Sequence, residues 1–90
     1  MCTMIAQQIK LQGSAKAGVD WIRVDTASVG YDHPFEMPVE FALTIDFTHQ
    51  AGTPGERVAV ELDVSSARAL VQVIQEVLRQ AEVGGFISNG

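Results

Sequence analysis

Residues 39–64 read VEFALTIDFTHQAGTPGERVAVELDV, and this stretch decides the fold. Apolar side chains occupy every second position over residues 39–47, and again over residues 58–64. Such alternation is typical of β-strands that turn one row of side chains to a core and the other row outward. The intervening residues 49–56 contain glycine and proline, which favour a turn. The stretch therefore predicts an antiparallel hairpin.

The first half of the chain predicts a second hairpin with a less regular pattern. Residues 4–12 form a candidate strand, residues 13–18 a loop of small residues, and residues 19–33 the returning strand. In the returning strand, the apolar positions change parity near Asp25 and Thr26. A β-bulge at that point reconciles the two halves, whereas the alternative has Trp21 facing inward and no bulge. Pro34 and Pro38 then bracket the connection into the third strand.

The C-terminal part of the chain predicts an amphipathic helix from Ser65 or Ser66 to about Glu82. Its apolar side chains recur with the i, i+3, i+4, i+7 spacing of a helix, and they are Ala67, Leu70, Val71, Ile74, Val77, Leu78 and Ala81. A serine is expected to cap the first turn, and Gly84 with Gly85 to end the helix. At about 1.5 Å per residue, the helix is roughly as long as an eight-residue strand.

These elements predict an α+β fold, a four-stranded antiparallel meander (ββββα) with the C-terminal helix packed on one sheet face. Residues 1–85 are expected to form a single domain and residues 86–90 a flexible tail. The chain of 90 residues is 47% hydrophobic and 19% charged, which fits one small core.

The composition excludes several classes of protein. Eleven acidic and six basic residues give a net charge of −5, which disfavours nucleic acid and anionic membranes as partners. The single cysteine excludes an internal disulfide. No apolar run reaches the ~18 residues of a membrane span, and no secretion signal is recognisable. We therefore expect a cytoplasmic protein.

The second sheet face is predicted to mediate self-association. Its central positions are small or neutral: Ala6, Gln8, Ala42, Thr44 and Ala59. A solvated face usually has longer charged side chains, whereas small residues suit a contact between sheets or a shallow pocket. A domain this short also buries little apolar surface. We therefore expect a homodimer through this small-residue face, the alternative being a stable monomer with an ordinary half-polar sheet.

One end of the sheet is predicted to hold the titratable residues Cys2, Asp32 and His33. A thiolate, an imidazole and a carboxylate can bind zinc or copper, and Cys with His can also act as nucleophile and base. His33 and Asp32 are accordingly the candidate catalytic residues. The structural alternative is that His33 forms a hydrogen bond within a turn and Cys2 packs as a small hydrophobic residue. His49 lies at the opposite end and reaches a metal site only across a dimer.

Two further groups have both a functional and a structural interpretation. Trp21, Tyr31, Phe35 and Met37 are candidates for an apolar ligand pocket, or else pack as ordinary core and turn residues. Glu61 and Asp63 are paired carboxylates, but Glu61 is expected to face Arg57 or a strand neighbour in solvent.

The opening Met1-Cys2-Thr3, residues 31–34 (YDHP) and residues 58–63 (VAVELD) resemble a family of short, mainly actinomycete proteins with a domain of unknown function. The resemblance implies an association with specialised metabolism but no site residue. We therefore expect a homo-oligomeric binding or interaction protein handling a small molecule or a partner. The alternatives are a cofactor-independent cyclase or isomerase with His33 or a carboxylate as general base, and a metal-binding protein using Cys2 and His33.

Overall fold

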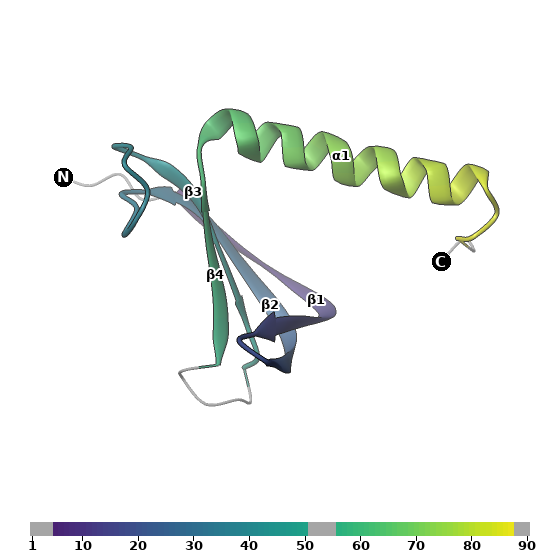
Figure 1. Ribbon diagram of the computed structural model, residues 1–90, viewed down its shortest axis with the longest axis horizontal. Helices are drawn as coiled ribbons and strands as arrows, with labels where there is room; N and C mark the ends of the chain where they lie inside the picture. The colour runs from purple at the N-terminus through teal and green to yellow at the C-terminus, as the bar shows by residue number, and fades with distance from the viewer. Residues whose placement is uncertain (1–4, 51–55, 88–90) are drawn as a thin grey trace.

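The computed structural model describes residues 5–50 and 56–87. Four strands and a helix follow one another along the chain: β1 (Ile5–Ala17), β2 (Asp20–Asp32), β3 (Ala42–Thr48), β4 (Arg57–Leu62) and α1 (Val64–Val83) (Figure 1). The strands form one antiparallel sheet in the order β1-β2-β3-β4. The predicted α+β fold, a four-stranded meander followed by a single helix, is thereby confirmed.

The strand register assigns the side chains to two faces. Val29, Ile45 and Val60 lie side by side, and alternate residues of each strand share their side of the sheet. The apolar face defined in this way carries Val29, Tyr31, Leu43, Ile45, Phe47, Val58, Val60 and Leu62. The opposite, small-residue face carries Ala6, Gln8, Ser28, Gly30, Ala42, Thr44, Asp46, Ala59 and Glu61.

The first hairpin is longer than the sequence pattern predicts. β1 continues to Ala17, and the turn consists of Gly18 and Val19 alone. Gly18 has a φ of +69° and Val19 does not have a positive φ, as in a type II′ turn, which suits the right-handed twist of the strands. Small side chains in residues 13–17 therefore indicate close strand pairing here and not a loop.

A register shift interrupts the first hairpin at the level of Asp25. Lys10 pairs with Thr26 and Gly13 pairs with Val24, so Leu11 and Gln12 together lie opposite Asp25. The bulge lies at the level that the sequence predicted, but the extra residue belongs to β1 and not to β2. Parity along one strand shows that a register changes, whereas only the pairing shows which strand has the additional residue.

The helix begins directly after the sheet. Asp63 is the only residue between β4 and α1, and it is the N-cap, with its Oδ1 accepting a hydrogen bond from the Ser66 amide at 2.8 Å. The expected serine cap is therefore wrong by two or three positions, because the carboxylate lies one position before the helix. At the other end Gly85 has a φ of +79° and the Phe86 amide donates to the Ala81 carbonyl, as expected for a glycine stop.

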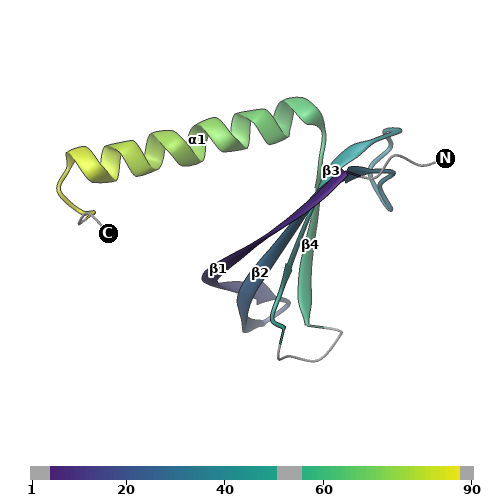
Figure 2. The same cartoon turned by 180° about the vertical axis from the view of Figure 1, so that it is seen from behind.

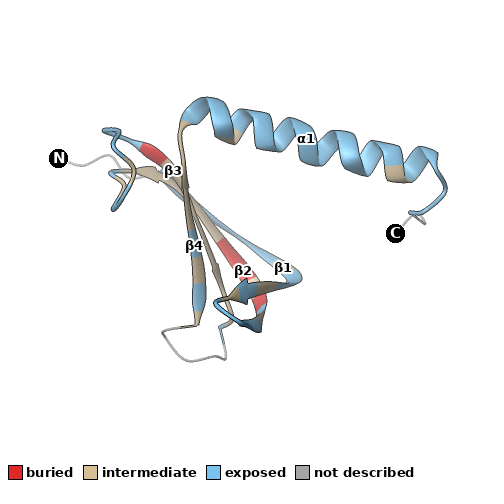
Figure 3. Ribbon diagram, viewed as in Figure 1, coloured by how far each residue is buried: buried red, intermediate tan, exposed pale blue. Residues whose placement is uncertain are grey.

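The helix makes few contacts with the sheet, chiefly with β3. From the end of β4, α1 runs away from the strands instead of along them (Figures 1 and 2). No residue of α1 is buried, and Leu70, Ile74 and Val77 are 42%, 50% and 57% exposed. Within the described ranges, the buried apolar residues are Val24, Ala27 and Ala42 on β2 and β3 (Figure 3).

The positive φ at Gly18 predicts a backbone cost for any other residue there. Gly18→Ala is expected to lower the free energy of unfolding by about 1–2 kcal/mol, since an L-residue disfavours this region of φ. The cost comes from the backbone conformation alone, because a Cβ at this position would meet no atom within 4 Å. Gly13→Ala is the control, because its Cβ would lie 3.5 Å from Val24. Urea denaturation should find that control neutral or stabilised by up to about 1 kcal/mol. Equal effects of the two substitutions would contradict the turn assignment.

Candidate functional site

A small pocket lies on the small-residue face, between the sheet and the segment that connects β2 to β3. Its volume is about 130 Å³. The lining residues come from β3, β4 and the connecting segment: Asp32, His33, Phe35, Thr44, Ile45, Asp46, Arg57, Ala59, Val60 and Glu61. We call this site the outer pocket. The small side chains of Thr44 and Ala59 leave the space that it occupies.

Glu61 fastens the connecting segment over the sheet. Its two carboxylate oxygens accept hydrogen bonds from the backbone amides of Phe35 at 2.6 Å, Glu36 at 3.0 Å and Met37 at 3.1 Å. These bonds, the one from Phe35 first, lower the pKa of Glu61. Glu61 thus anchors backbone instead of facing Arg57 or a strand neighbour as expected. The anchored segment also explains why β3 begins at Ala42, although the alternating pattern begins at residue 39.

Residues close to His33 in sequence hold it at the rim of the outer pocket. Its Nδ1 lies 2.9 Å from the Glu40 carbonyl oxygen, so that nitrogen carries the proton and donates. The ring stacks on Phe41 with centroids 4.6 Å apart. Asp32 accepts the His33 amide at 2.7 Å. The two candidate catalytic residues are therefore adjacent, but they meet through the backbone amide and not as a carboxylate–imidazole pair.

Asp46 and Arg57 give the outer pocket its charge. Arg57 Nε lies 3.7 Å from Asp46 Oδ1, beyond hydrogen-bond distance. Asp46 Oδ1 is buried and accepts no hydrogen bond from any group in the described part of the chain. A buried carboxylate oxygen without a donor is costly, so a molecule that offers an N–H or O–H group at this point is favoured.

The four residues predicted to form an apolar ligand pocket, Trp21, Tyr31, Phe35 and Met37, do not all come together. Trp21 lies at the Gly18 end of β2, opposite Lys16, whereas Tyr31 lies at the other end, opposite Ile5. β2 runs 13 residues without turning back, so these two side chains are separated by most of its length. Phe35 lines the outer pocket, but is 96% exposed. Tyr31 packs on Phe41, with ring centroids 5.6 Å apart.

The predicted metal site includes Cys2, which lies outside the described residues. Within residues 5–50 and 56–87, no group of three or more His, Cys, Asp or Glu side chains is arranged to hold a metal ion. Zinc or copper binding through Cys2 and His33 therefore stays a prediction, as does a contribution from His49 across a dimer. His49 lies at the opposite end of the sheet from His33, as expected from the strand order.

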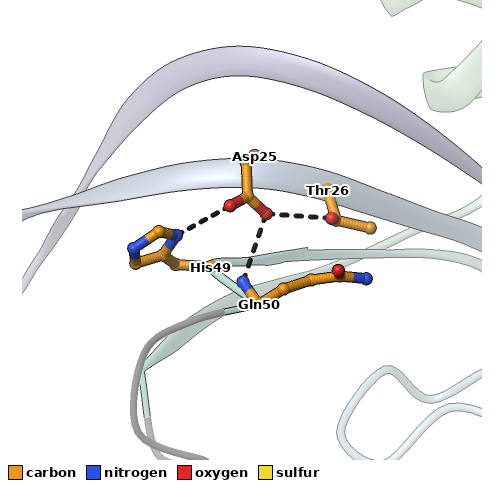
Figure 4. A network of polar contacts seen from close by, with 4 residues as sticks. All are labelled: Asp25, Thr26, His49 and Gln50. Atoms are coloured by element: carbon orange, nitrogen blue, oxygen red, sulfur yellow. Dashed lines mark hydrogen bonds and ion pairs between the residues drawn. The ribbon is translucent and has the colours of Figure 1, made fainter.

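A second polar cluster joins β2 to the end of β3 (Figure 4). Asp25 Oδ2 accepts a hydrogen bond from His49 Nδ1 at 2.8 Å, while its Oδ1 accepts one from Thr26 Oγ1 at 2.9 Å and one from the Gln50 amide at 3.2 Å. These bonds, the one from His49 first, lower the pKa of Asp25. The arrangement fixes the protonated nitrogen of a neutral His49 at Nδ1 and leaves Nε2 as its acceptor.

This Asp25–His49 pair is absent from the sequence-based candidates, although the sequence contained a signal for it. Thr26 pairs with Thr48, so one further step of the same antiparallel register brings Asp25 opposite His49. The pair lies opposite the bulge of β1, where a widened ladder commonly accompanies a re-aimed side chain. Extending the strand pairing by one residue would have identified the pair.

Comparison with known proteins gives a family but no activity. The profile of DUF6295, a family of unknown function, matches residues 1–86. No curated protein and no solved structure matches the chain. No helix among the described residues is long and apolar enough to cross a membrane.

The Glu61 anchor predicts a linked acid titration. The ionised carboxylate holds the three amides, and because its pKa is below the ordinary glutamate value of 4.5, the bonds persist at pH 4.5 and are lost on further acidification. The amide NMR signals of Phe35, Glu36 and Met37 should therefore shift together, with a midpoint below 4.5. Glu61→Gln should abolish this shared shift and Glu36→Gln should leave it. Independent midpoints for the three amides would refute the anchor.

Proposed function

This chain belongs to DUF6295, and since that family has no assigned function, we propose from the geometry that it is a self-associating binding protein. In this proposal the exposed helix, in place of the small-residue face expected from the sequence, provides the assembly surface, and the outer pocket takes a small polar molecule. The observation that supports it most directly is that α1 has an apolar side and no buried residue. A cytoplasmic location and a place in bacterial specialised metabolism are further parts of the proposal, and they rest on the sequence.

The exposure of α1 supports self-association. The side chains Leu70, Val71, Ile74, Val77 and Leu78 are each between 42% and 57% exposed, and all belong to one side of the helix. Monomeric proteins rarely expose a continuous apolar surface larger than a few hundred Å². Burial of apolar side chains is the main favourable term in folding and association, so this surface favours assembly.

The outer pocket supports binding of a small molecule with a hydrogen-bond donor. Asp46 Oδ1 lacks a hydrogen-bond donor among the described residues, and Arg57 lies close by. The carboxylate of Glu61, by contrast, already accepts hydrogen bonds from backbone amides. The pocket volume of about 130 Å³ suits a molecule of few non-hydrogen atoms. A primary amine or an amide would satisfy Asp46, and Arg57 would bind a carbonyl or carboxylate on the same molecule.

A binding test follows from the role given to Asp46. Native mass spectrometry of the protein from its own host should show a retained small molecule, and Asp46→Asn should weaken its binding at least tenfold. That loss corresponds to about 1.4 kcal/mol, within the range of a hydrogen bond to a charged group. Titration calorimetry with the recovered molecule would measure it.

Asp20→Asn is the matched control, because Asp20 lies beside the hairpin turn, far from the outer pocket. Equal affinity in Asp46→Asn and Asp20→Asn would contradict the proposed recognition. A crystal structure of host-purified protein that shows water and no other molecule in the outer pocket would contradict it as well.

An enzyme is the second candidate, and the Asp25–His49 pair favours it. A carboxylate that holds Nδ1–H of an imidazole leaves Nε2 able to take a proton from a substrate. A cyclase or isomerase would then use His49 as the general base in place of the expected His33, because the partner of His33 Nδ1 is a neutral backbone carbonyl and not a carboxylate that stabilises the protonated ring.

Replacement of each histidine separates the two candidate bases. If the protein consumes a compound in a host metabolite extract, His49→Gln should abolish that consumption and His33→Gln should preserve it, as followed by mass spectrometry of the extract. Circular dichroism confirms that both variants fold. Turnover that survives in His49→Gln would exclude His49 as the base.

A further inference from the structure

We propose that a second copy of this chain fills the cleft between α1 and the apolar face, with the two α1 helices packed antiparallel about a two-fold axis at Ile74. This inference rests on the proposed self-association and specifies its surface and symmetry. The apolar stripe of each α1 would pack on that of the other copy across this axis, and the helix pair would lie beside the apolar faces of both sheets.

The cleft is apolar on both sides. Its sheet side is formed by Val29, Leu43 and Ile45, and its helix side by Leu70, Val71 and Ile74. It has a volume of about 370 Å³ and is open to solvent. Contacts between the helix and the sheet within one chain are few and involve β3, so most of both surfaces stays free. Arg68 also lines the cleft on its helix side, while the six residues named above form an apolar surface that suits the apolar side chains of a partner helix.

The apolar pattern of α1 is symmetric about Ile74. Read from either end, the stripe is Ala, Leu, Val, Ile, Val, Leu, Ala at Ala67, Leu70, Val71, Ile74, Val77, Leu78 and Ala81. In an antiparallel pair centred on Ile74, each residue therefore meets the counterpart of its own type: Ala67 meets Ala81, Leu70 meets Leu78, and Val71 meets Val77. A two-fold interface requires this kind of self-complementary surface. The pattern thus favours a second copy over an unrelated partner.

The exposed surface is large enough for an obligate dimer. The chain exposes 7207 Å², whereas a compact monomer of 9.7 kDa exposes about 5,100 Å². The excess is roughly 2,000 Å² per chain, or about 4,000 Å² for two copies. This total falls within the range of about 2,000–5,000 Å² buried in obligate homodimers. The radius of gyration agrees, since it is 15.2 Å and a compact chain of this length has about 12 Å.

The connection at Asp63 disfavours closure of α1 onto its own sheet. Asp63 has φ −74° and ψ 168°, and it bonds the first turn through both its side chain and its carbonyl. To lie along β4, α1 would have to turn at this single residue and lose the cap. A second copy covers the same surfaces without any change at Asp63.

Cysteine cross-linking tests the proposed arrangement in the full chain, with Cys2→Ser as background. Ile74→Cys should form a disulfide-linked dimer on mild oxidation, because this position meets itself at the two-fold axis. Leu70→Cys alone should not, but a mixture of Leu70→Cys and Leu78→Cys protein should give the mixed dimer. Gln72→Cys is the matched control, since it lies on the other side of α1 and should stay unlinked.

Light scattering at micromolar concentration separates this inference from the proposed self-association. A mass of twice 9.7 kDa together with the expected cross-links supports both. A dimer that links through Thr44→Cys and not through Ile74→Cys leaves self-association standing and overturns the helix arrangement in favour of the small-residue face. A Leu70→Cys dimer in isolation means parallel helices and also overturns it. A monomer at every concentration contradicts both proposals.

Discussion

The single-residue connection at Asp63 is the constraint on which the rest of this structure depends. A helix that starts one residue after a strand, capped by that residue, has its direction set by one pair of backbone angles. Here those angles direct α1 away from the sheet, and two apolar surfaces that a longer loop would bring together stay apart. Because apolar burial is the principal source of stability, the fold of one chain is incomplete in this respect. Its few buried apolar residues, Val24, Ala27 and Ala42 in the described ranges, reflect the same constraint.

The elements of the fold could be predicted from the sequence, but their arrangement only in part. The apolar patterns of residues 4–33 and 39–64 predicted the four strands and their order, and the spacing of apolar residues after residue 64 predicted the helix. The direction of α1 could not be predicted, since the stripe shows which side seeks burial and not what covers it. The start of β3 was also missed, because Val39 and Phe41 continue the strand pattern while the preceding residues are bound to Glu61.

The site was predictable where neighbours in sequence determine it. Asp32 and His33, which are adjacent in sequence, line one pocket, and Phe35 joins them there although the sequence placed it in a different candidate group. Residue types alone could not show which atoms each side chain contacts through hydrogen bonds. Glu61 was expected to face solvent and instead binds three amides, since a segment 24 to 26 residues away folds back over it. Trp21 was grouped with Tyr31 although the two residues lie at opposite ends of β2.

The bulge in β1 also has a consequence for how far assembly can proceed. β1 is an edge of the sheet, and edges of this kind readily add strands from other molecules, which leads to fibrils. The extra residue between Lys10 and Gly13 interrupts the ladder, and the lysines of the chain, Lys10 and Lys16, both lie in this strand. Charge and irregularity at an edge are common protections against such growth. Open-ended polymerisation is thus disfavoured at this edge of the sheet, whatever other surface the protein uses for contacts.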